Sequence, residues 1–277
     1  MSDRVQLQID GGTATLSLNR PDKHNGVDRS MLKGVIRAQK QLKRERALRA
    51  VIVRGEGPSF CAGIDAKDFM LNPLRAVLSV GSLFSPWRNA FQTWSLGFRE
   101  LGVPVIAVIH GNCFGAGIQL ALGADIRIAR PDARVSIMEA RLGLVPDMGG
   151  PTLLRELLPL DVAKELTMTG RILSGIEACE LGLVTHVSEE PLARAAALVE
   201  EIAARSPDAV AAGKFLLQRV WGASEYMSLV HERGYQRRVI GRPNQRLALQ
   251  RSQKKRATEE AREDAAAPNY APRSIEF

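Results

Sequence analysis

The stretch that decides the fold reads VPVIAVIHGNCFGAGIQLALGADIRIA and runs from Val103 to Ala129. Its first part, residues 105–109, is an apolar run rich in β-branched side chains, which is typical of a buried strand. We expect a turn at residues 110–112 and a helix that begins among the glycines that follow. Gly123 is placed to end that helix. The stretch therefore predicts a strand, a glycine turn and a short helix.

A second stretch of the same kind lies earlier in the chain. Residues 50–54 (AVIVR) are an expected strand, and a turn containing several glycines follows over residues 55–65. If the two strands are neighbours in one sheet, their turns can direct two backbone N–H groups to one point, which is how an oxyanion hole is built. A phosphate loop does not fit, because a GxxxxGK sequence followed by Ser or Thr is absent and Leu120 occupies the last glycine position of GxGxxG. The alternative is that these glycines serve only the close packing of helix and strand.

Four sequence blocks resemble those of the crotonase superfamily, the enoyl-CoA hydratases and isomerases. They are NRPDKHNGVD (19–28), SFCAGIDAKDF (59–69), HGNCFGAGIQLALGADIRIA (110–129) and EARLGLVPDMGG (139–150), and the resemblance covers roughly residues 5–260. It implies an α/β fold, with a crotonase-like core of repeated strand-strand-helix units and a C-terminal helical region. It also implies an acyl-CoA thioester substrate whose carbonyl lies between the backbone N–H groups of Ile64 and Ala116.

The resemblance also assigns residues to the substrate. In this family the corresponding blocks line the coenzyme A and acyl site, which here implies contacts from Lys23, His24, Ala62, Gly63, Asp65, Lys67, Gly115 and Gln119. The two lysines are expected near the coenzyme A phosphates. No separate cofactor is expected, because coenzyme A is part of the substrate. No metal site is expected either, since the three cysteines form no CxxC motif or Cys/His cluster. We expect Cys61 to be an inert core residue and not a nucleophile activated by His110.

Two carboxylates are the predicted acid/base pair. Glu139 occupies the position of the second glutamate of the hydratases, and Asp147 follows it in a loop that Gly143 and Pro146 interrupt. This spacing resembles the pair of the Δ3,5-Δ2,4-dienoyl-CoA isomerases, although those enzymes usually carry an aspartate where Gln119 stands. The hydratases carry a glutamate there. The sequence departs from both patterns, because an amide cannot exchange a proton as a carboxyl does.

The predicted function is double-bond isomerisation of an enoyl- or dienoyl-CoA through an enolate that the amide pair stabilises. Two alternatives stay open. One is an enoyl-CoA hydratase that adds water with Glu139, and the other is a non-catalytic protein that holds acyl-CoA on the same scaffold. The two carboxylates could also be plain loop groups, or Asp147 could cap the helix expected after Gly150.

The chain has 277 residues, which is enough for a sizeable core and an appendage. We expect an α/β core with the coenzyme A and catalytic site over residues 1–195. A C-terminal helical region over residues 196–277 is expected to cover the site and support oligomerisation, with an extended tail from about residue 265. The resemblance implies a homotrimer or a homohexamer.

The formal net charge is +8, and basic side chains gather late, between residues 233 and 256. A solvated helical face is the favoured interpretation, and attraction of a polyanionic coenzyme A thioester is another. Nucleic-acid binding is not expected, because aromatic residues are not interleaved with these charges. The uncharged run 103–124 contains His110, Asn112 and Gln119, so no membrane insertion is expected. The N-terminus lacks the pattern of a secretory signal, which favours a cytoplasmic location.

Local signals predict the other elements. Asp28 is an expected N-cap of a helix that runs to about residue 45, and Ser174 with Glu177 forms an expected capping box. The chain beyond Pro191 is helical in pattern, with breaks at Pro207 and Pro243. The aromatic residues between 71 and 100 are expected to pack in the core, the alternative being that they line the acyl pocket. The remaining expectations are a hairpin over 5–18, strands over 134–138 and 184–187, and helices over 150–158 and 161–169.

Overall fold

The computed structural model describes residues 4–65, 81–257 and 269–276 of the chain. Within these ranges the strands form a large sheet in the order β1-β2-β3-β4-β6-β9 and a small sheet in the order β5-β7-β8. The strands are β1 (Val5–Asp10), β2 (Thr13–Leu18), β3 (Ala50–Gly55), β4 (Val105–Ile109), β5 (Asn112–Phe114), β6 (Ile126–Ala129), β7 (Arg134–Ser136), β8 (Leu173–Ser174) and β9 (His186–Val187). The expected α/β fold class is confirmed.

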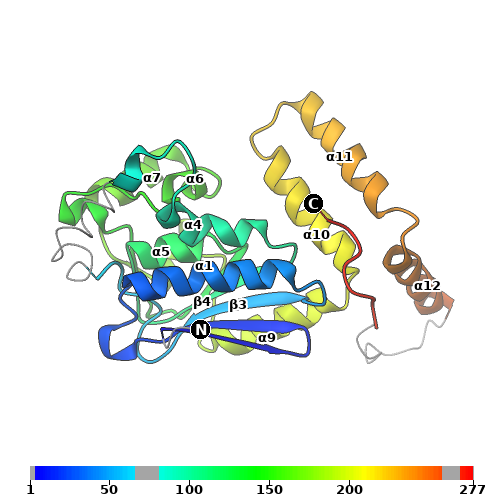
Figure 1. Ribbon diagram of the computed structural model, residues 1–277, viewed down its shortest axis with the longest axis horizontal. Coiled ribbons are helices and arrows are strands. Elements are labelled where there is room, and N and C mark those ends of the chain that lie inside the picture. Colours follow the sequence, from blue (N-terminus) through cyan, green and yellow to red (C-terminus); the bar gives the residue numbers. More distant parts are fainter. Residues whose placement is uncertain (1–3, 66–80, 258–268, 277) are drawn as a thin grey trace.

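The helices surround the large sheet and continue into a C-terminal extension (Figure 1). They are α1 (Arg29–Arg44), α4 (Ala90–Leu96), α5 (Ala116–Leu122), α6 (Gly150–Leu154), α7 (Leu160–Thr169), α8 (Gly175–Glu180), α9 (Pro191–Ala203), α10 (Pro207–Val220), α11 (Glu225–Val239) and α12 (Pro243–Ala257). Short 3₁₀ turns are η1 (Pro21–Lys23), η2 (Ser82–Phe84), η3 (Gly97–Glu100) and η4 (Glu139–Leu142).

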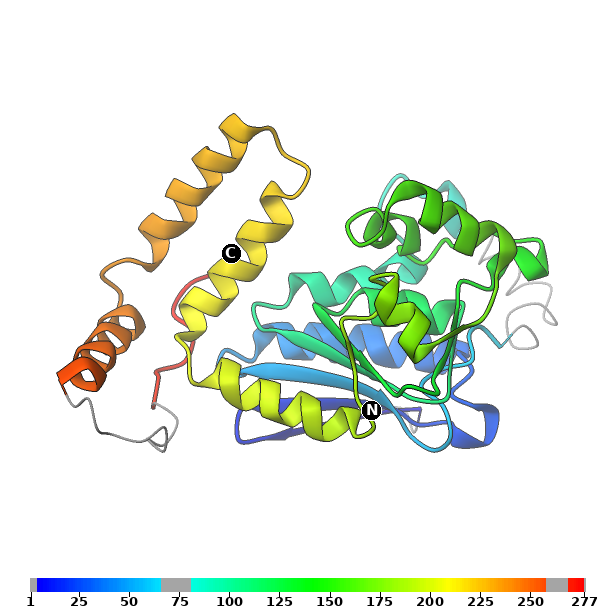
Figure 2. The same cartoon turned by 180° about the vertical axis from the view of Figure 1, so that it is seen from behind.

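The central strands β3 and β4 of the large sheet are buried on both faces, which explains their continuous apolar sequences. Alternate residues of a strand point to opposite faces, so in β3 Val51 and Val53 pack into the core cluster that contains α1, whereas Ala50 and Ile52 pack against α9. Figure 2 shows α9 on the opposite side of the sheet from α1. Within the large sheet, the described strands from β2 onward pair in parallel, whereas β1 and β2 form an antiparallel hairpin.

The core repeats a unit of long strand, short strand and helix. In one unit β4 lies in the large sheet, β5 turns into the small sheet, and α5 follows at once. The expectation of a simple turn at residues 110–112 is wrong in part, because residues 112–114 pair in parallel with β7. The described part of the preceding unit begins in the same way, since β3 is followed by Cys61, which forms a parallel bridge with Cys113 of β5.

Beyond α9 the chain forms an arm of α10, α11 and α12 that extends to one side of the core (Figures 1 and 2). Pro191, Pro207 and Pro243 each occupy the first position of a helix, where a missing N–H costs nothing. The boundary expected at residue 195 falls inside α9. The described tail, residues 269–276, is extended and returns to α10, where Ser274 and Ile275 donate backbone hydrogen bonds to the buried carboxylate of Asp208.

Several local expectations need correction. The helix expected over 150–158 ends at Leu154, and the strand expected over 184–187 contains only residues 186–187. The aromatic residues between 71 and 100 were expected in the core, but only some of those described lie there. Trp94 and Phe98 are fully buried, whereas Phe84 and Trp87 are exposed. No helix of the described residues is long and apolar enough to cross a membrane.

Candidate active site

The backbone segments that lead to Ile64 and Ala116 lie side by side. The parallel bridge between Cys61 and Cys113 is closed by hydrogen bonds from Cys61 N to Asn112 O and from Phe114 N to Cys61 O, each 2.9 Å long. Ile64 follows the first of these segments and Ala116 follows the second. A Cβ atom placed on Gly63 would lie 3.8 Å from the amide nitrogen of Ala116. The backbone before Ile64 therefore passes directly beside the first turn of α5.

Glycine is required at position 63 for two independent reasons. Its φ is +98°, a conformation that L side chains rarely adopt, and an added Cβ would lie 3.0 Å from the carbonyl oxygen of Phe114. Ala116 is the first residue of α5, and its carbonyl accepts a 2.8 Å hydrogen bond from the buried indole of Trp94. Among the described residues, neither Ile64 N–H nor Ala116 N–H has a hydrogen-bond acceptor.

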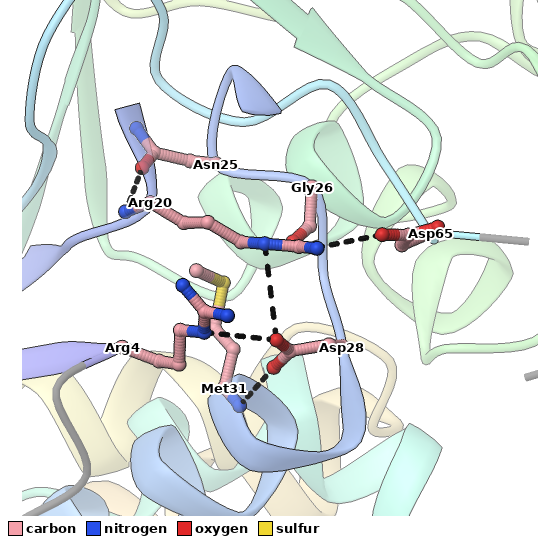
Figure 3. Close-up of polar contacts among 7 residues, drawn as sticks. All are labelled: Arg4, Arg20, Asn25, Gly26, Asp28, Met31 and Asp65. Carbon is pink, nitrogen blue, oxygen red and sulfur yellow. Dashed lines mark hydrogen bonds and ion pairs between the residues drawn. The ribbon is translucent and has the colours of Figure 1, made fainter. Parts of the chain in front are cut away.

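A polar network supports the segment that carries Ile64 (Figure 3). Arg20 donates to Gly26 O at 3.0 Å and forms a 2.8 Å ion pair with Asp65, while Asp28 caps α1 by accepting from Met31 N at 2.7 Å. Backbone hydrogen bonds from Val27 N to Gly63 O and from Asp65 N to Val27 O complete the connection. Residues 19–28 therefore hold the backbone on both sides of Ile64.

Glu139 and Gln119 form the polar centre beside this amide pair. Glu139 begins η4 and is partly buried, and a Cβ placed on Gly115 would lie 3.5 Å from its Oε1 atom. Gln119, on α5, is 1% exposed and donates through Nε2 to Glu139 Oε1 at 2.6 Å. The other carboxylate oxygen, Glu139 Oε2, is buried and has no hydrogen-bond partner among the described residues.

The two predicted catalytic carboxyls both have altered acidity. Burial raises the pKa of Glu139, the hydrogen bond from Gln119 opposes that rise, and the nearby charge of Asp147 adds to it. Asp147 is accessible to solvent, yet partial enclosure raises the pKa of its carboxyl as well. Asp147 does not cap a helix, because α6 has Gly149 at its N-cap without a side-chain hydrogen bond. The structure thus brings the two carboxyls within electrostatic reach of each other.

The other residues assigned to the substrate lie in two groups. Gly115 and Gln119 lie with Glu139, whereas Lys23 and His24 lie on the exposed η1 turn and its C-cap. That turn contacts the 62–65 segment, because Ala62 N donates to His24 O at 2.9 Å and His24 Nδ1 lies 2.9 Å from Ser59 Oγ. Asp65 is engaged by Arg20. Lys67 lies outside the described residues.

The structure does not support a nucleophilic role for Cys61 with His110 as its base. Cys61 is fully buried, and burial raises the pKa of its thiol to about 12, so the thiol stays protonated near neutral pH. His110 places Nε2 2.9 Å from Gly57 O. In the described part of the chain, no three His, Cys, Asp or Glu side chains gather in a way that could hold a metal ion.

Comparison with known proteins agrees with this architecture. The family model described as enoyl-CoA hydratase/isomerase matches residues 8–256. Human mitochondrial methylglutaconyl-CoA hydratase is 34% identical over 180 residues, which are 65% of this chain and 51% of that protein. The 1,2-epoxyphenylacetyl-CoA isomerase of Escherichia coli (strain K12) is 32% identical over 190 residues, covering 69% of this chain and 71% of that enzyme. The chain spans about half the length of the methylglutaconyl-CoA hydratases that it matches.

Solved structures show the same fold over nearly the whole chain. The enoyl-CoA hydratase of Bacillus anthracis superposes with a TM-score of 0.85 at 28% identity and covers 96% of this chain and 98% of that one. A Thermobifida fusca protein solved in complex with acetoacetyl-CoA superposes with a TM-score of 0.76 at 32% identity, over 84% of this chain and 93% of that one. The α/β core described above is the fold of the crotonase class of enzymes. The chain belongs to the enoyl-CoA hydratase/isomerase family within that class.

Proposed function

We propose that the protein moves a carbon–carbon double bond along the acyl chain of an enoyl- or dienoyl-CoA. One observation carries the proposal: Glu139 has one oxygen engaged by Gln119, leaves Oε2 buried without a described partner, and lies beside a second carboxyl of raised pKa, Asp147. Proton transfer between two carbons needs one group to remove a proton and another to deliver one. Two carboxyls in different environments suit these two tasks.

The reaction begins when the thioester carbonyl accepts hydrogen bonds from the N–H groups of Ile64 and Ala116. A carboxylate, for which Glu139 is the proposed group, then removes a proton from the carbon next to the carbonyl. The electron pair of that C–H bond moves into the conjugated system, and negative charge accumulates on the carbonyl oxygen, where the two amides stabilise it. Reprotonation at the far end of the conjugated system, with Asp147 as the proposed acid, leaves the double bond in its new position.

The substrate class rests on the relatives. The Thermobifida fusca structure contains acetoacetyl-CoA, which supports a coenzyme A thioester here. Lys23 and His24 lie on the exposed turn that contacts the 62–65 segment, and they are proposed to bind the coenzyme A part together with Lys67. No further cofactor is proposed. A homotrimer or homohexamer remains the proposed assembly, with the C-terminal helices in its contacts.

A hydratase that uses Glu139 alone is the second candidate. The similarity to human methylglutaconyl-CoA hydratase favours it. Against it stands Gln119, because its amide is neutral and cannot donate and recover a proton during the addition of water. A non-catalytic acyl-CoA-binding protein is the third candidate, and it would bind the thioester without changing it.

The three candidates separate in one assay series. The wild type, Glu139→Gln and Asp147→Asn are offered a 3,5-dienoyl-CoA, a 3-enoyl-CoA and a trans-2-enoyl-CoA, and the absorbance of the conjugated thioester is followed. We expect isomerisation by the wild type and its loss in both variants. Hydration that needs Glu139 but not Asp147 would establish the second candidate instead. Binding of acyl-CoA by calorimetry with no turnover of any of the three would establish the third.

A further inference from the structure

Gln119 joins the two segments that carry the proposed catalytic carboxyls. Its Nε2 donates to Glu139 Oε1 at 2.6 Å, and its Oε1 accepts from Met148 N and Gly150 N at 2.9 Å each. We propose that Gln119 is a positioning residue that selects Glu139 Oε2 as the proton-accepting atom and fixes the Asp147 loop relative to it. This inference rests on the proposed function, since it assigns the proton transfer to these carboxyls.

The orientation of the Gln119 amide follows from its partners. Backbone N–H groups can only donate, so the atom that receives both Met148 N and Gly150 N must be the amide oxygen. The NH₂ group then has to face Glu139. The side chain is 1% exposed, so water cannot replace any of these partners cheaply. Gln119 is thus a fixed hydrogen-bond donor with no freedom to rotate its amide.

A fixed donor makes the two oxygens of Glu139 unequal. Oε1 already accepts from Gln119, whereas Oε2 is buried without a partner in the described part of the chain. A donor on Oε1 favours the ionised carboxylate. It acts against burial and against the charge of Asp147, the titratable neighbour that raises the pKa of Glu139. Arg141, on the same 3₁₀ turn, packs instead against Gly170, where an added Cβ would lie 3.1 Å from Arg141 Cγ. Glu139 is therefore held as a base whose active atom is Oε2.

The same side chain holds the loop that carries Asp147. Met148 and Gly150 flank Gly149, whose φ is +91°, and the Ser95 hydroxyl donates to Met148 O. Without the Gln119 oxygen, two buried N–H groups would lose their acceptor, and the loop would lose the link that sets its distance from Glu139. The position of the Asp147 loop relative to Glu139 therefore depends on the Gln119 amide.

The substitutions Gln119→Glu and Gln119→Met separate the two parts of this role, which are orienting Glu139 and holding the Asp147 loop. In Gln119→Glu the acceptor for Met148 N and Gly150 N is kept, but the atom facing Glu139 becomes an oxygen at donor distance, which requires a shared proton. In Gln119→Met both the acceptor and the donor disappear. Gln39→Met is the matched control, because Gln39 is 4% exposed and donates to Trp94 O at 2.9 Å without contact to either carboxyl.

The experiment measures kcat and KM for isomerisation against pH in the wild type and the three variants. We expect Gln119→Met to lower kcat roughly 10–100-fold, the usual effect of losing a group that orients a reacting residue, and to move the acid limb of the kcat profile to higher pH. We expect Gln119→Glu to stay active at low pH and to acquire a new loss of activity at high pH, when the shared proton leaves. KM should stay close to that of the wild type in both. Gln39→Met should lower Tm and leave the pH profile unchanged.

Unchanged pH profiles in both Gln119 variants would overturn the inference, since a merely structural glutamine would affect Tm alone. A substrate-independent readout keeps this outcome distinct from failure of the proposed function. The infrared carboxylate band of Glu139 is obtained by subtracting the spectrum of a Glu139→Gln protein from that of the protein that retains Glu139. The pH dependence of this band is then measured both with Gln119 in place and in the Gln119→Met background. If the Glu139 band titrates at higher pH after Gln119→Met, the positioning role is supported even if no isomerase substrate is found. If the band titrates identically with and without Gln119→Met, the positioning role is contradicted.

Discussion

Replacement of Ala116 by proline removes a single proposed catalytic atom with little change to the fold. Ala116 is the first residue of α5, the helical position that proline tolerates best. Its N–H donates to no described residue, so the substitution removes no hydrogen bond from the described part of the chain. Its carbonyl, which accepts from the indole of Trp94, is retained in proline. Ala116→Pro should therefore fold, and its effect should appear in catalysis.

The expected loss follows from the number of donors. In the proposed function two amides donate to the thioester oxygen, and the variant keeps the one at Ile64. Loss of one oxyanion-hole donor costs roughly 10²–10³ in kcat, or about 2.7–4 kcal/mol of transition-state stabilisation. The assay is isomerisation of a dienoyl-CoA under saturating substrate, with circular dichroism and Tm measured in parallel. Ala116→Gly is the control, because it keeps the N–H and should retain a rate of the same order as the wild type.

A folded Ala116→Pro protein with a normal kcat would refute the reasoning, because the N–H would then have no part in the transition state. A rise in KM alone, with kcat unchanged, would also refute it. That pattern would mean that the amide binds the ground state and the transition state equally.

Two further predictions concern stability. Burial, with the charge of Asp147, raises the pKa of Glu139, so the folded state loses stability as pH rises from the ordinary glutamate pKa to the raised one. Glu139→Gln should therefore raise Tm at neutral pH, and thermal scans should show that this gain shrinks towards acid pH. The side chain of Lys214 is almost buried, and its ammonium donates to Asp125 at 2.7 Å and to two backbone carbonyls. Asp125→Asn leaves this ammonium without its carboxylate, so it should lower the free energy of unfolding in urea by about 3 kcal/mol. The double variant with Lys214→Met should recover part of that loss.

The parts of the fold that were predicted correctly depend on local chemistry. Asp28 caps α1, and Ser174 with Glu177 forms a capping box, because each signal lies within one turn of the residues that it satisfies. Residues 105–109 form a strand as expected, since an apolar β-branched run suits a sheet that is buried on both faces.

The errors arise where distant segments decide the outcome. The glycine-containing sequence at residues 110–112 suggests a turn, yet residues 112–114 pair with residues 134–136, which lie beyond α5. The local sequence over residues 84–98 does not distinguish buried aromatic residues from exposed ones. Only tertiary packing makes Trp94 buried and Trp87 exposed. The role of Gln119 as a link between Glu139 and the 148–150 loop was equally invisible, because its partners lie 20 to 31 positions further along the chain.

The candidate site is built from backbone more than from side chains, and this explains which of its positions tolerate change. Gly63 needs a positive φ beside Phe114 O, and a Cβ placed on Gly117 would collide with Cys61 O, so neither glycine can be replaced without moving the strands that carry the two amides. The side chains of Ile64 and Ala116 can be replaced more freely, because the proposed function uses only the backbone N–H groups of these residues. Selection should then act on the glycines and on their supporting contacts, Arg20 on one side and Gln119 on the other. Chemistry can change through the carboxyls, while the amide pair that is proposed to receive the carbonyl stays in place.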